Sequence, residues 1–205
     1  LTMFSLGQIK RTRFAGLNAM IDAARLRDEK IDAYHVGFVL GPRLNACGRM
    51  GHAREAVRLL TEAEGEEASE LAKFLTKENE RRRETEKAIY EQAERQVREA
   101  GHDRSDRRAI VLADENWHQG VIGIVASRLV DAFARPVVML SCDNGTAKGS
   151  ARSVEGVHMH QAFTACGDYL EGFGGHAMAA GLTLKTKNIE RSEERRVGKE
   201  CIVKC

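Results

Sequence analysis

Hydrophobic and polar positions at the start of the chain follow the spacing of helices. Apolar side chains recur every three or four positions in 17–24 and again in 53–60, so each segment predicts a short amphipathic helix. The stretch 41–49 between them interrupts this pattern. Pro42 disfavours helical backbone at Gly41, and a later glycine permits a tight turn. We therefore expect a loop over 41–49, between two helices.

The segment 64–100 predicts the longest helix of the chain. Apolar residues lie near both of its ends, but 76–87 contains none, and a helix without an apolar face cannot bury itself. Three glutamate–arginine pairs have the favourable i, i+4 order, namely Glu78–Arg82, Glu91–Arg95 and Glu94–Arg98. A coiled coil is the competing interpretation, but its apolar repeat is not sustained across 76–87. We therefore expect a solvated connector between two packed bodies.

Beyond residue 104 the pattern changes to alternating strands and helices. The predicted elements are a strand at 109–113, a helix at 121–133, a strand at 136–141, a turn at 143–145, a strand at 147–154 and a helix at 157–170. A glycine-rich segment, 172–181, follows them. Strands that alternate with helices over short connections predict an α/β unit with helices packed against a sheet.

Charge and composition limit the kind of partner. The 205 residues include 32 Lys and Arg against 30 Asp and Glu, which gives a formal net charge of +2. This balance excludes a polycation of the histone type, so any nucleic-acid site must be a local patch. Hydrophobic residues at 42% and charged residues at 30% are typical of a globular chain rather than a disordered one.

The sequence carries no signal for a membrane or for secretion. The longest apolar stretches, such as 121–126, fall far short of the roughly 18 residues that a membrane span needs. The first residues lack a charged segment followed by an apolar core. The five cysteines form no C-x-x-C pair, so reduced thiols are expected rather than a disulfide framework or a zinc cluster. These features predict a cytoplasmic protein, and the initial Leu1 predicts a piece of a longer one.

The end of the chain, 191–205, fits none of these patterns. It has no hydrophobic periodicity, is rich in Lys and Arg, and holds two of the five cysteines. The sequence 191–201 resembles the translation of a sequencing-library adapter, so we expect 191–205 to be extraneous. The alternative is a basic tail that contacts nucleic acid.

A cluster of phosphate-binding residue types occupies the predicted strand 147–154. Arg152 offers two parallel donors, Ser150 and Ser153 offer hydroxyl donors, and Lys148 adds a positive charge beside a glycine that lets the backbone approach a ligand. These residues predict a phosphate site. The alternative is an ordinary exposed strand with a solvated arginine.

The glycine-rich segment contains a second candidate site. Gly174 and Gly175 precede His176 and a run of small residues, a pattern that predicts a helix N-terminus open to close backbone approach. Free N–H groups there favour an anion, and His176 could donate to a phosphate oxygen or transfer a proton. The alternative is a turn before a closely packed core helix.

The expected loop 41–49 is a third, cationic candidate, because Arg43 and Arg49 flank Asn45. Solvated or ion-paired arginines are the alternative. Among the other polar and aromatic residues, Trp117 is expected to be structural and the role of His118 stays open. His158 and His160 have no carboxylate or cysteine at ligand spacing, so no metal site is expected there.

Together the motifs resemble a known family. G-P-R-L-N-A-C-G-R-M, W-H-Q-G-V-I-G-I-V-A-S-R-L, K-G-S-A-R-S and F-G-G-H-A-M-A-A-G, in this order, are similar to the RecJ single-stranded-DNA-specific exonucleases of the DHH phosphoesterase superfamily. The last two motifs resemble the DHHA1 domain, and the similarity covers about 1–185. It implies a bacterial cytoplasmic enzyme of DNA repair and recombination that degrades single strands from the 5′ end with Mn²⁺ or Mg²⁺. A repair helicase or a single-strand-binding protein is a further implied partner.

The resemblance implies an α/β fold with the helical end of a DHH domain, a long connector helix and a DHHA1 domain whose mixed sheet is flanked by helices. The implied parts are the C-terminal helical part of a DHH catalytic domain at 1–63, the connector at 64–104, a DHHA1 substrate-binding domain at 105–190 and the extraneous tail at 191–205. The expected phosphate-contacting residues are Arg43, Asn45, Arg49, Lys148, Ser150, Arg152, Ser153, Gly174, Gly175 and His176. Within this set, Ser150 and Arg152 are expected to grip the 5′ end and His176 to lie nearest the scissile phosphate.

The chain departs from the family in its metal site. It contains no D-H-H motif and no aspartate-rich motif after a strand, so the two metal ions of the family have no ligands here and the chain alone is expected to be inactive. The missing DHH domain would act in cis. Two alternatives stay open: a DHH/DHHA1 phosphodiesterase of oligonucleotides or cyclic dinucleotides, and a nucleic-acid-binding module without catalysis.

Overall fold

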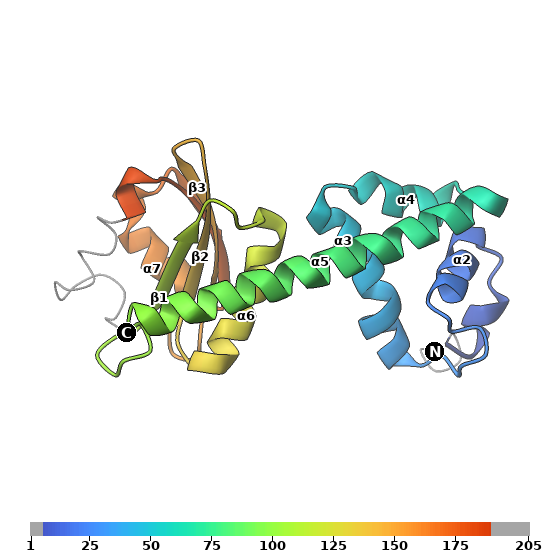
Figure 1. The fold of residues 1–205 in the computed structure, drawn as a ribbon, viewed down its shortest axis with the longest axis horizontal. Helices are drawn as coiled ribbons and strands as arrows, with labels where there is room; N and C mark the ends of the chain where they lie inside the picture. The colour runs from blue at the N-terminus through green and yellow to red at the C-terminus, as the bar shows by residue number, and fades with distance from the viewer. Residues whose placement is uncertain (1–5, 190–205) are drawn as a thin grey trace. The chain divides into compact units, whose positions relative to one another are not determined.

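The computed structural model describes residues 6–189 and divides the chain into two compact units. The first unit ends at Glu84 and the second begins at Thr85, so the division falls within the long helix α5 (Gly65–Glu99). Helix α5 is drawn in green in Figure 1. The adapter-like segment 191–205 lies outside the described residues. Within them, no helix is both long enough and apolar enough to cross a membrane.

The first unit is helical. Its elements are η1 (Ile9–Arg11), α2 (Ala15–Ala23), the π-helix η2 (His35–Leu40), α3 (Gly41–Met50), α4 (Ala53–Thr61) and the beginning of α5. The apolar positions of the amphipathic segments form the core of this unit, with Met20, Ile21, Leu59 and Leu75 at most 1% exposed. The two helices predicted at 17–24 and 53–60 are therefore confirmed.

Helices α2 and α4 pack closely because α2 has a glycine at the contact. A Cβ atom on Gly16 would overlap the backbone carbonyl of Leu59. Gly16 is itself buried. The absence of a side chain at this position therefore fixes how closely the two helix axes can approach.

The prediction of a loop over 41–49 is wrong, because this stretch forms helix α3. Pro42 lies in the first turn of α3, where a missing N–H costs least. Gly41 keeps helical dihedrals because it has no Cβ to clash with the proline ring. The helix buries Ala46 and Cys47, and it ends at Gly51, whose φ of +96° gives a left-handed cap.

Helix α5 confirms the helix predicted over 64–100, but its central part is not solvated throughout. Glu78 and Asn79 are only 5% and 6% exposed, although neither is apolar. The Oε2 atom of Glu78 lies 3.9 Å from Nε2 of His52, which directly follows the C-terminal turn of α3. Part of the predicted connector therefore belongs to the packed interior of the first unit.

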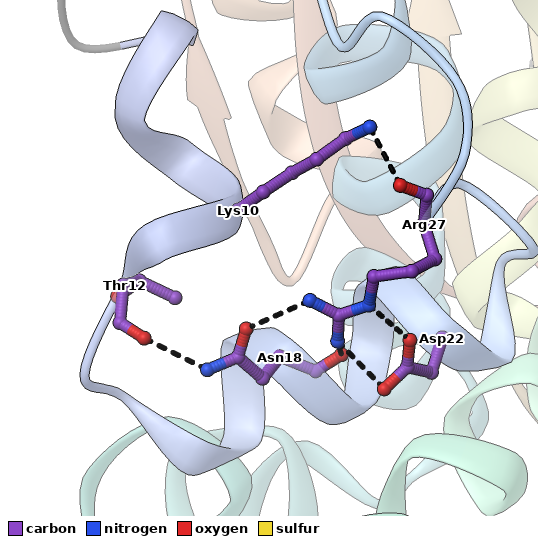
Figure 2. A network of polar contacts seen from close by, with 5 residues as sticks. All are labelled: Lys10, Thr12, Asn18, Asp22 and Arg27. Carbon is purple, nitrogen blue, oxygen red and sulfur yellow. Dashed lines mark hydrogen bonds and ion pairs between the residues drawn. The ribbon is translucent and has the colours of Figure 1, made fainter.

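A polar network ties the chain before α2 to the loop that follows it (Figure 2). The guanidinium of Arg27 donates to both carboxylate oxygens of Asp22 at 2.6 and 2.7 Å, and to the side-chain oxygen of Asn18 at 3.3 Å. Asn18 in turn donates to the carbonyl of Thr12, and Lys10 donates to the carbonyl of Arg27. The network therefore links these two segments through polar side chains.

The second unit contains a five-stranded sheet of order β1-β2-β3-β5-β4. Its strands are β1 (Ile110–Asp114), β2 (Val137–Asp143), β3 (Thr146–Arg152), β4 (Gly172–Gly175) and β5 (Ala179–Lys185). Strands β1 and β2 are parallel and are joined through α6 (Gln119–Phe133), and the other pairs are antiparallel. The predicted α/β unit with a mixed sheet is confirmed.

The two faces of the sheet are covered differently. Helix α6 packs on β2 and β3, whereas α7 (Met159–Ala165) contacts β4 and β5. Figure 1 shows α6 and α7 on opposite sides of the strands. On the α7 side the core includes Leu140, Ala151 and Phe163. Because α6 does not extend over β5 and β4, it leaves its side of the sheet open above these two strands.

The tight turn predicted at 143–145 is confirmed between β2 and β3. Asn144 and Gly145 have φ values of +47° and +81°, as a two-residue type I′ turn requires. The helix predicted at 157–170 is shorter than expected, because α7 ends at Ala165 and a 3₁₀ turn, η3 (Gly167–Tyr169), follows it.

The helix N-terminus predicted around Gly174 and Gly175 is wrong, because these residues end strand β4 of a hairpin with β5. Strand β5 alternates buried Ala180, Leu182 and Leu184 with more exposed neighbours, which is the period of a strand. From Ala179 onward the small residues therefore follow a two-residue repeat, and the sheet, not a helix, buries every second residue.

Candidate nucleic-acid interface

The candidate phosphate-binding residues of β3 point to the same face of the sheet. Successive side chains of a strand alternate between faces, and Ala147 and Ala151 are buried in the core on the α7 side. Lys148, Ser150 and Arg152 therefore lie on the opposite face, which α6 partly covers. The three residues that the sequence analysis assigned to a phosphate site therefore share one face.

Ser150 and Arg152 form a hydrogen-bonded pair at the α6 end of this face. Nη1 of Arg152 donates to Oγ of Ser150 at 2.9 Å and to the carbonyl of Ala151 at 2.8 Å. Both side chains are half-buried. An arginine held on two acceptors loses little rotamer freedom when it binds an anion, which favours a charge-assisted contact with a phosphate.

A glycine floor continues from this pair toward the edge of the sheet. Register places Ser150 opposite Gly181 and Lys148 opposite Thr183, and Gly174 lies beyond Gly181 on β4. These positions share one face. Gly181 and Gly174 form the glycine floor, a surface over β5 and β4 that is made mostly of backbone. A flat or extended ligand could lie directly against it.

The glycine floor lines a groove of about 390 Å³. Gln119, at the start of α6, and Lys148 border it, and Gly172, Gly174 and Thr183 lie in its lining. A Cβ atom on Gly172 or Gly174 would meet no protein atom within 4 Å. The groove is therefore open to solvent above both glycines, and a single lysine supplies its positive charge.

His176 lies in the turn between β4 and β5, next to the end of the sheet that carries Arg152. The backbone N–H of His176 donates to the carbonyl of Ala179, the residue that pairs with Arg152. Nδ1 of His176 accepts from the N–H of Met178 at 3.3 Å. In the neutral ring this places the proton on Nε2, which makes Nε2 a donor for an anionic oxygen.

Two other predicted residues have structural tasks. The side chain of Ser153 is buried, and its hydroxyl donates to the carbonyl of Val157 at 2.7 Å, so it points into a turn rather than toward a phosphate. Gly175 has a φ of +148°, and a Cβ there would overlap Ala180. Gly175 shapes the hairpin, whereas Gly174 leaves the groove open.

The three residues of the cationic motif 41–49 lie in the first unit, on helix α3. Asn45 and Arg49 are one turn apart on its exposed side. Arg43 is half-buried, and it donates to the carbonyl of Val39 at 2.6 Å and to Oγ1 of Thr76 at 3.3 Å. Burial lowers the pKa of its guanidinium, whose charge nevertheless persists at neutral pH.

Gln92 and Asp114 support the site but were not singled out from the sequence, whereas their neighbours Trp117 and His118 were. Gln92 of α5 donates to Asp114 at 2.6 Å and accepts from the indole N–H of Trp117 at 3.0 Å. Trp117 is 2% exposed, which confirms its predicted structural role. Nδ1 of His118 accepts from the N–H of Gly120 and caps α6. This network fixes the loop that places Gln119 at the groove.

The described residues do not fit a metal centre. Within 6–189, no group of three or more His, Cys, Asp or Glu side chains is arranged to hold a metal ion. His158 is occupied as the cap of α7, where its Nδ1 accepts from the N–H of Gln161, and the ring of His160 lies 5.5 Å from that of Phe173.

The class of this protein follows from its second unit. Residues 106–195 match the family model of the DHHA1 domain, so the chain carries a DHHA1 domain. Within that class the chain is similar to the single-stranded-DNA-specific exonuclease RecJ over most of its length. It is 41% identical to RecJ of Bacillus subtilis over 186 residues and 37% identical to RecJ of Escherichia coli over 186 residues. The similarity expected from the motifs is confirmed.

Solved structures agree with this assignment. RecJ of Thermus thermophilus in complex with Mg²⁺ matches 97% of the chain with a TM-score of 0.80 and 31% identity. An exonuclease RecJ bound to manganese matches 93% of the chain with a TM-score of 0.81. The chain spans only 23% of the B. subtilis relative, 32% of the E. coli relative, and 31% and 46% of the two solved chains.

Proposed function

We propose that this chain holds the phosphates of single-stranded DNA for a RecJ-like exonuclease that hydrolyses the strand from its 5′ end. The observation that carries this proposal is the row of Lys148, Ser150 and Arg152 on one face of β3, beside an open groove floored by glycine. The names of the similar proteins supply the substrate class, single-stranded DNA.

Each residue of the site has a distinct task in this proposal. Arg152, oriented by Ser150, takes the terminal 5′-phosphate through charge-assisted hydrogen bonds. Lys148 neutralises a phosphate further along the groove, and the glycine floor admits the extended backbone of the strand. His176 donates from Nε2 to a phosphate oxygen near the bond to be cleaved. In the first unit, Asn45 and Arg49 contact the backbone of the DNA.

Hydrolysis in this proposal depends on a metal centre from another part of a longer protein, a DHH domain in cis. Similar proteins were solved with Mg²⁺ and with Mn²⁺, and the described residues offer no matching ligands. Bound divalent ions would activate water and stabilise the leaving oxygen. The chain's own residues bind and orient the strand. A repair helicase or a single-strand-binding protein would present that strand in the cytoplasm.

The binding of labelled oligonucleotides to the whole chain, measured by fluorescence anisotropy, tests this proposal. We expect tighter binding of a single strand than of a blunt duplex, and tighter binding of a 5′-phosphorylated than of a 5′-hydroxyl strand. Gly174→Leu should weaken binding without loss of stability, because its side chain would enter only the groove. Lys148→Ala should weaken binding and reduce the salt dependence by about one phosphate contact.

Arg108→Ala is the matched control, because Arg108 is exposed and precedes β1, at the edge of the sheet far from the groove. It should leave binding unchanged. Equal affinities for single strand and duplex, or full binding by Gly174→Leu, would contradict the proposal. Preferential binding of a cyclic dinucleotide over the strand would favour a phosphodiesterase of short oligonucleotides instead.

A further inference from the structure

Helix α6 has a glycine in its interior at the point where it faces the Ser150–Arg152 pair. Gly123 is buried and lies in the second turn of this 15-residue helix, whose other buried positions carry side chains such as Val121, Ile122 and Val125. Glycine is the least favourable residue after proline in a helix interior. A buried helical glycine therefore indicates that something occupies the space of its missing side chain.

The occupant is the candidate phosphate-binding pair itself. A Cβ atom on Gly123 would lie 2.8 Å from Oγ of Ser150 and 3.0 Å from Nη2 of Arg152. The third nearest atom, at 3.5 Å, is Cβ of Ser150. The space above Gly123 is therefore filled by the two side chains that hold each other through the 2.9 Å hydrogen bond.

We propose that Gly123 is a positioning residue, whose missing side chain lets Ser150 hold Arg152 in the orientation that selects a 5′-phosphate. This inference rests on the proposed function and adds a determinant of its specificity. With a methyl group at residue 123, the Ser150 hydroxyl must rotate or α6 must move away from β3. The first change breaks the hydrogen bond between Ser150 and Arg152. The second removes the helix that packs against the pair, and both leave the charge of the guanidinium in place.

If Gly123 positions Arg152, a side chain at residue 123 should lower the preference for a 5′-phosphate over a 5′-hydroxyl without changing the charge of the site. An arginine that keeps its charge but loses its orientation still attracts the phosphates of the strand. It no longer forms the two aligned bonds that distinguish a 5′-phosphate from a 5′-hydroxyl. The salt dependence of binding should therefore stay unchanged while the preference for the 5′-phosphate falls.

The test compares Gly123→Ala with the wild-type chain in anisotropy titrations against 5′-phosphorylated and 5′-hydroxyl single strands at several salt concentrations. We expect Gly123→Ala to lower the preference for the 5′-phosphate about tenfold, as the loss of one charge-assisted hydrogen bond implies. The salt slope should not change. Gly37→Ala is the matched control, because it is also a helical glycine and its Cβ would meet nothing within 4 Å.

A double variant separates positioning from general damage. If Gly123→Ala acts by displacing the Ser150 hydroxyl, then Gly123→Ala combined with Ser150→Ala should be no worse than Ser150→Ala alone. Thermal melting followed by circular dichroism checks the fold of each variant. If Gly123→Ala melts early, Ser150→Thr enlarges the strand side of the same contact without altering the helix, and it should reduce the preference in the same way.

The outcomes distinguish this inference from the proposal on which it rests. The role of Gly123 alone is overturned if Arg152→Ala loses the preference for the 5′-phosphate while folded Gly123→Ala keeps it in full. Where Gly123→Ala does not fold, full preference in Ser150→Thr has the same meaning. A wild-type chain without any 5′-phosphate preference overturns the proposed 5′ grip, and the positioning role with it. Strictly additive losses in the double variant would also overturn the positioning role.

Discussion

Arg152 shows how a single residue can be tested at the site. Because its guanidinium is held on two acceptors, replacement by Ala should cost about 2–3 kcal/mol of binding to a 5′-phosphorylated strand. Lys at the same position should restore only part of this, since an ammonium keeps the charge but lacks the planar fork. The measurement is a cycle of wild type and variant against 5′-phosphate and 5′-hydroxyl strands.

The comparison residue for this cycle is Arg43 in the first unit. Its side chain is engaged with Val39 and Thr76, and the proposed function gives it no contact with the 5′ end. Arg43→Ala should change the affinity for both strands by the same factor. Equal losses for Arg152→Ala on the two strands would remove Arg152 from the 5′ pocket and make it a general backbone contact.

Cys47 provides a prediction about reactivity. Its thiol is fully buried, and burial raises its pKa to about 11, with a smaller contribution from the carboxylates of Glu78 and Glu55. A thiol reacts as the thiolate, so Cys47 in the folded chain should resist iodoacetamide at pH 8, whereas the urea-unfolded chain should be labelled readily.

Glu78→Gln should lower the pKa of Cys47 only partly, because burial is the larger cause. Labelling of each cysteine can be followed by peptide mass spectrometry from pH 7 to 10. Labelling of Cys47 as fast in the folded as in the unfolded chain would show that its surroundings are more open than the structure places them.

At the residue scale the sequence was informative where chemistry is local. The motif K-G-S-A-R-S places Lys148, Ser150 and Arg152 at alternate positions, so their common face could be predicted from the strand period alone. The burial of Ser153 and the contact of Gly123 with the pair could not, because both depend on segments that meet only in the folded sheet.

Gly16 allows the close approach of two helices to be tested at the scale of elements. Because its Cβ would overlap the Leu59 carbonyl, Gly16→Ala must push α2 away from α4, and it should destabilise the first unit by at least 1–3 kcal/mol, roughly the cost of overpacking a core. Helix propensity alone would predict the opposite sign. Urea unfolding followed by far-ultraviolet circular dichroism measures the difference.

Gly48→Ala in α3 is the control for Gly16→Ala, because its Cβ would enter open space. It should leave stability unchanged or raise it by up to about 1 kcal/mol through helix propensity. Equal stability changes for the two variants would mean that α2 and α4 pack less closely than described.

The two mispredicted elements share a cause, because in both the glycines, with a proline in the first, were given more weight than the burial pattern. In 41–49 the signals for a turn were a proline and glycines, but burial of Ala46 and Cys47 stabilises a helix in which Pro42 occupies the first turn. In 172–181 the glycines suggested a helix start, while the two-residue apolar repeat of β5 carried the correct signal. Helix α6 was predicted nearly to its ends because one helical period dominates its apolar positions. The ends of α5 were also predicted closely, because apolar residues at helical spacing lie near both of them.

At the scale of the whole molecule, the proposed function assigns binding and chemistry to different parts of a longer RecJ-like protein. Because the charge of the chain is nearly balanced, the proposed affinity for DNA would come from a few placed groups rather than from a general positive field. In the proposed function, the groove of the second unit and the exposed face of α3 in the first unit supply such groups. None of them is part of a cluster of metal ligands within 6–189.

The separation of binding from chemistry predicts that this chain binds a 5′-phosphorylated single strand but does not hydrolyse it. Phosphodiester hydrolysis by a two-metal centre needs bound ions to activate water and to stabilise the leaving oxygen, and the described residues provide no cluster for them. Incubation of the chain with a 5′-phosphorylated, 3′-labelled strand and Mn²⁺ should leave the strand intact, while anisotropy under the same conditions shows it bound.

The control for this prediction is the loss of binding in Arg152→Ala, which shows that the intact strand occupied the proposed site. Mn²⁺-dependent release of mononucleotides that elutes with the chain in every purification step, and that disappears in Arg152→Ala, would contradict the prediction. Such a result would mean that residues of this chain assemble a metal centre on binding DNA. Release that elutes away from the chain, or that Arg152→Ala leaves unchanged, would instead come from a contaminating nuclease, and the division of binding and chemistry would stand.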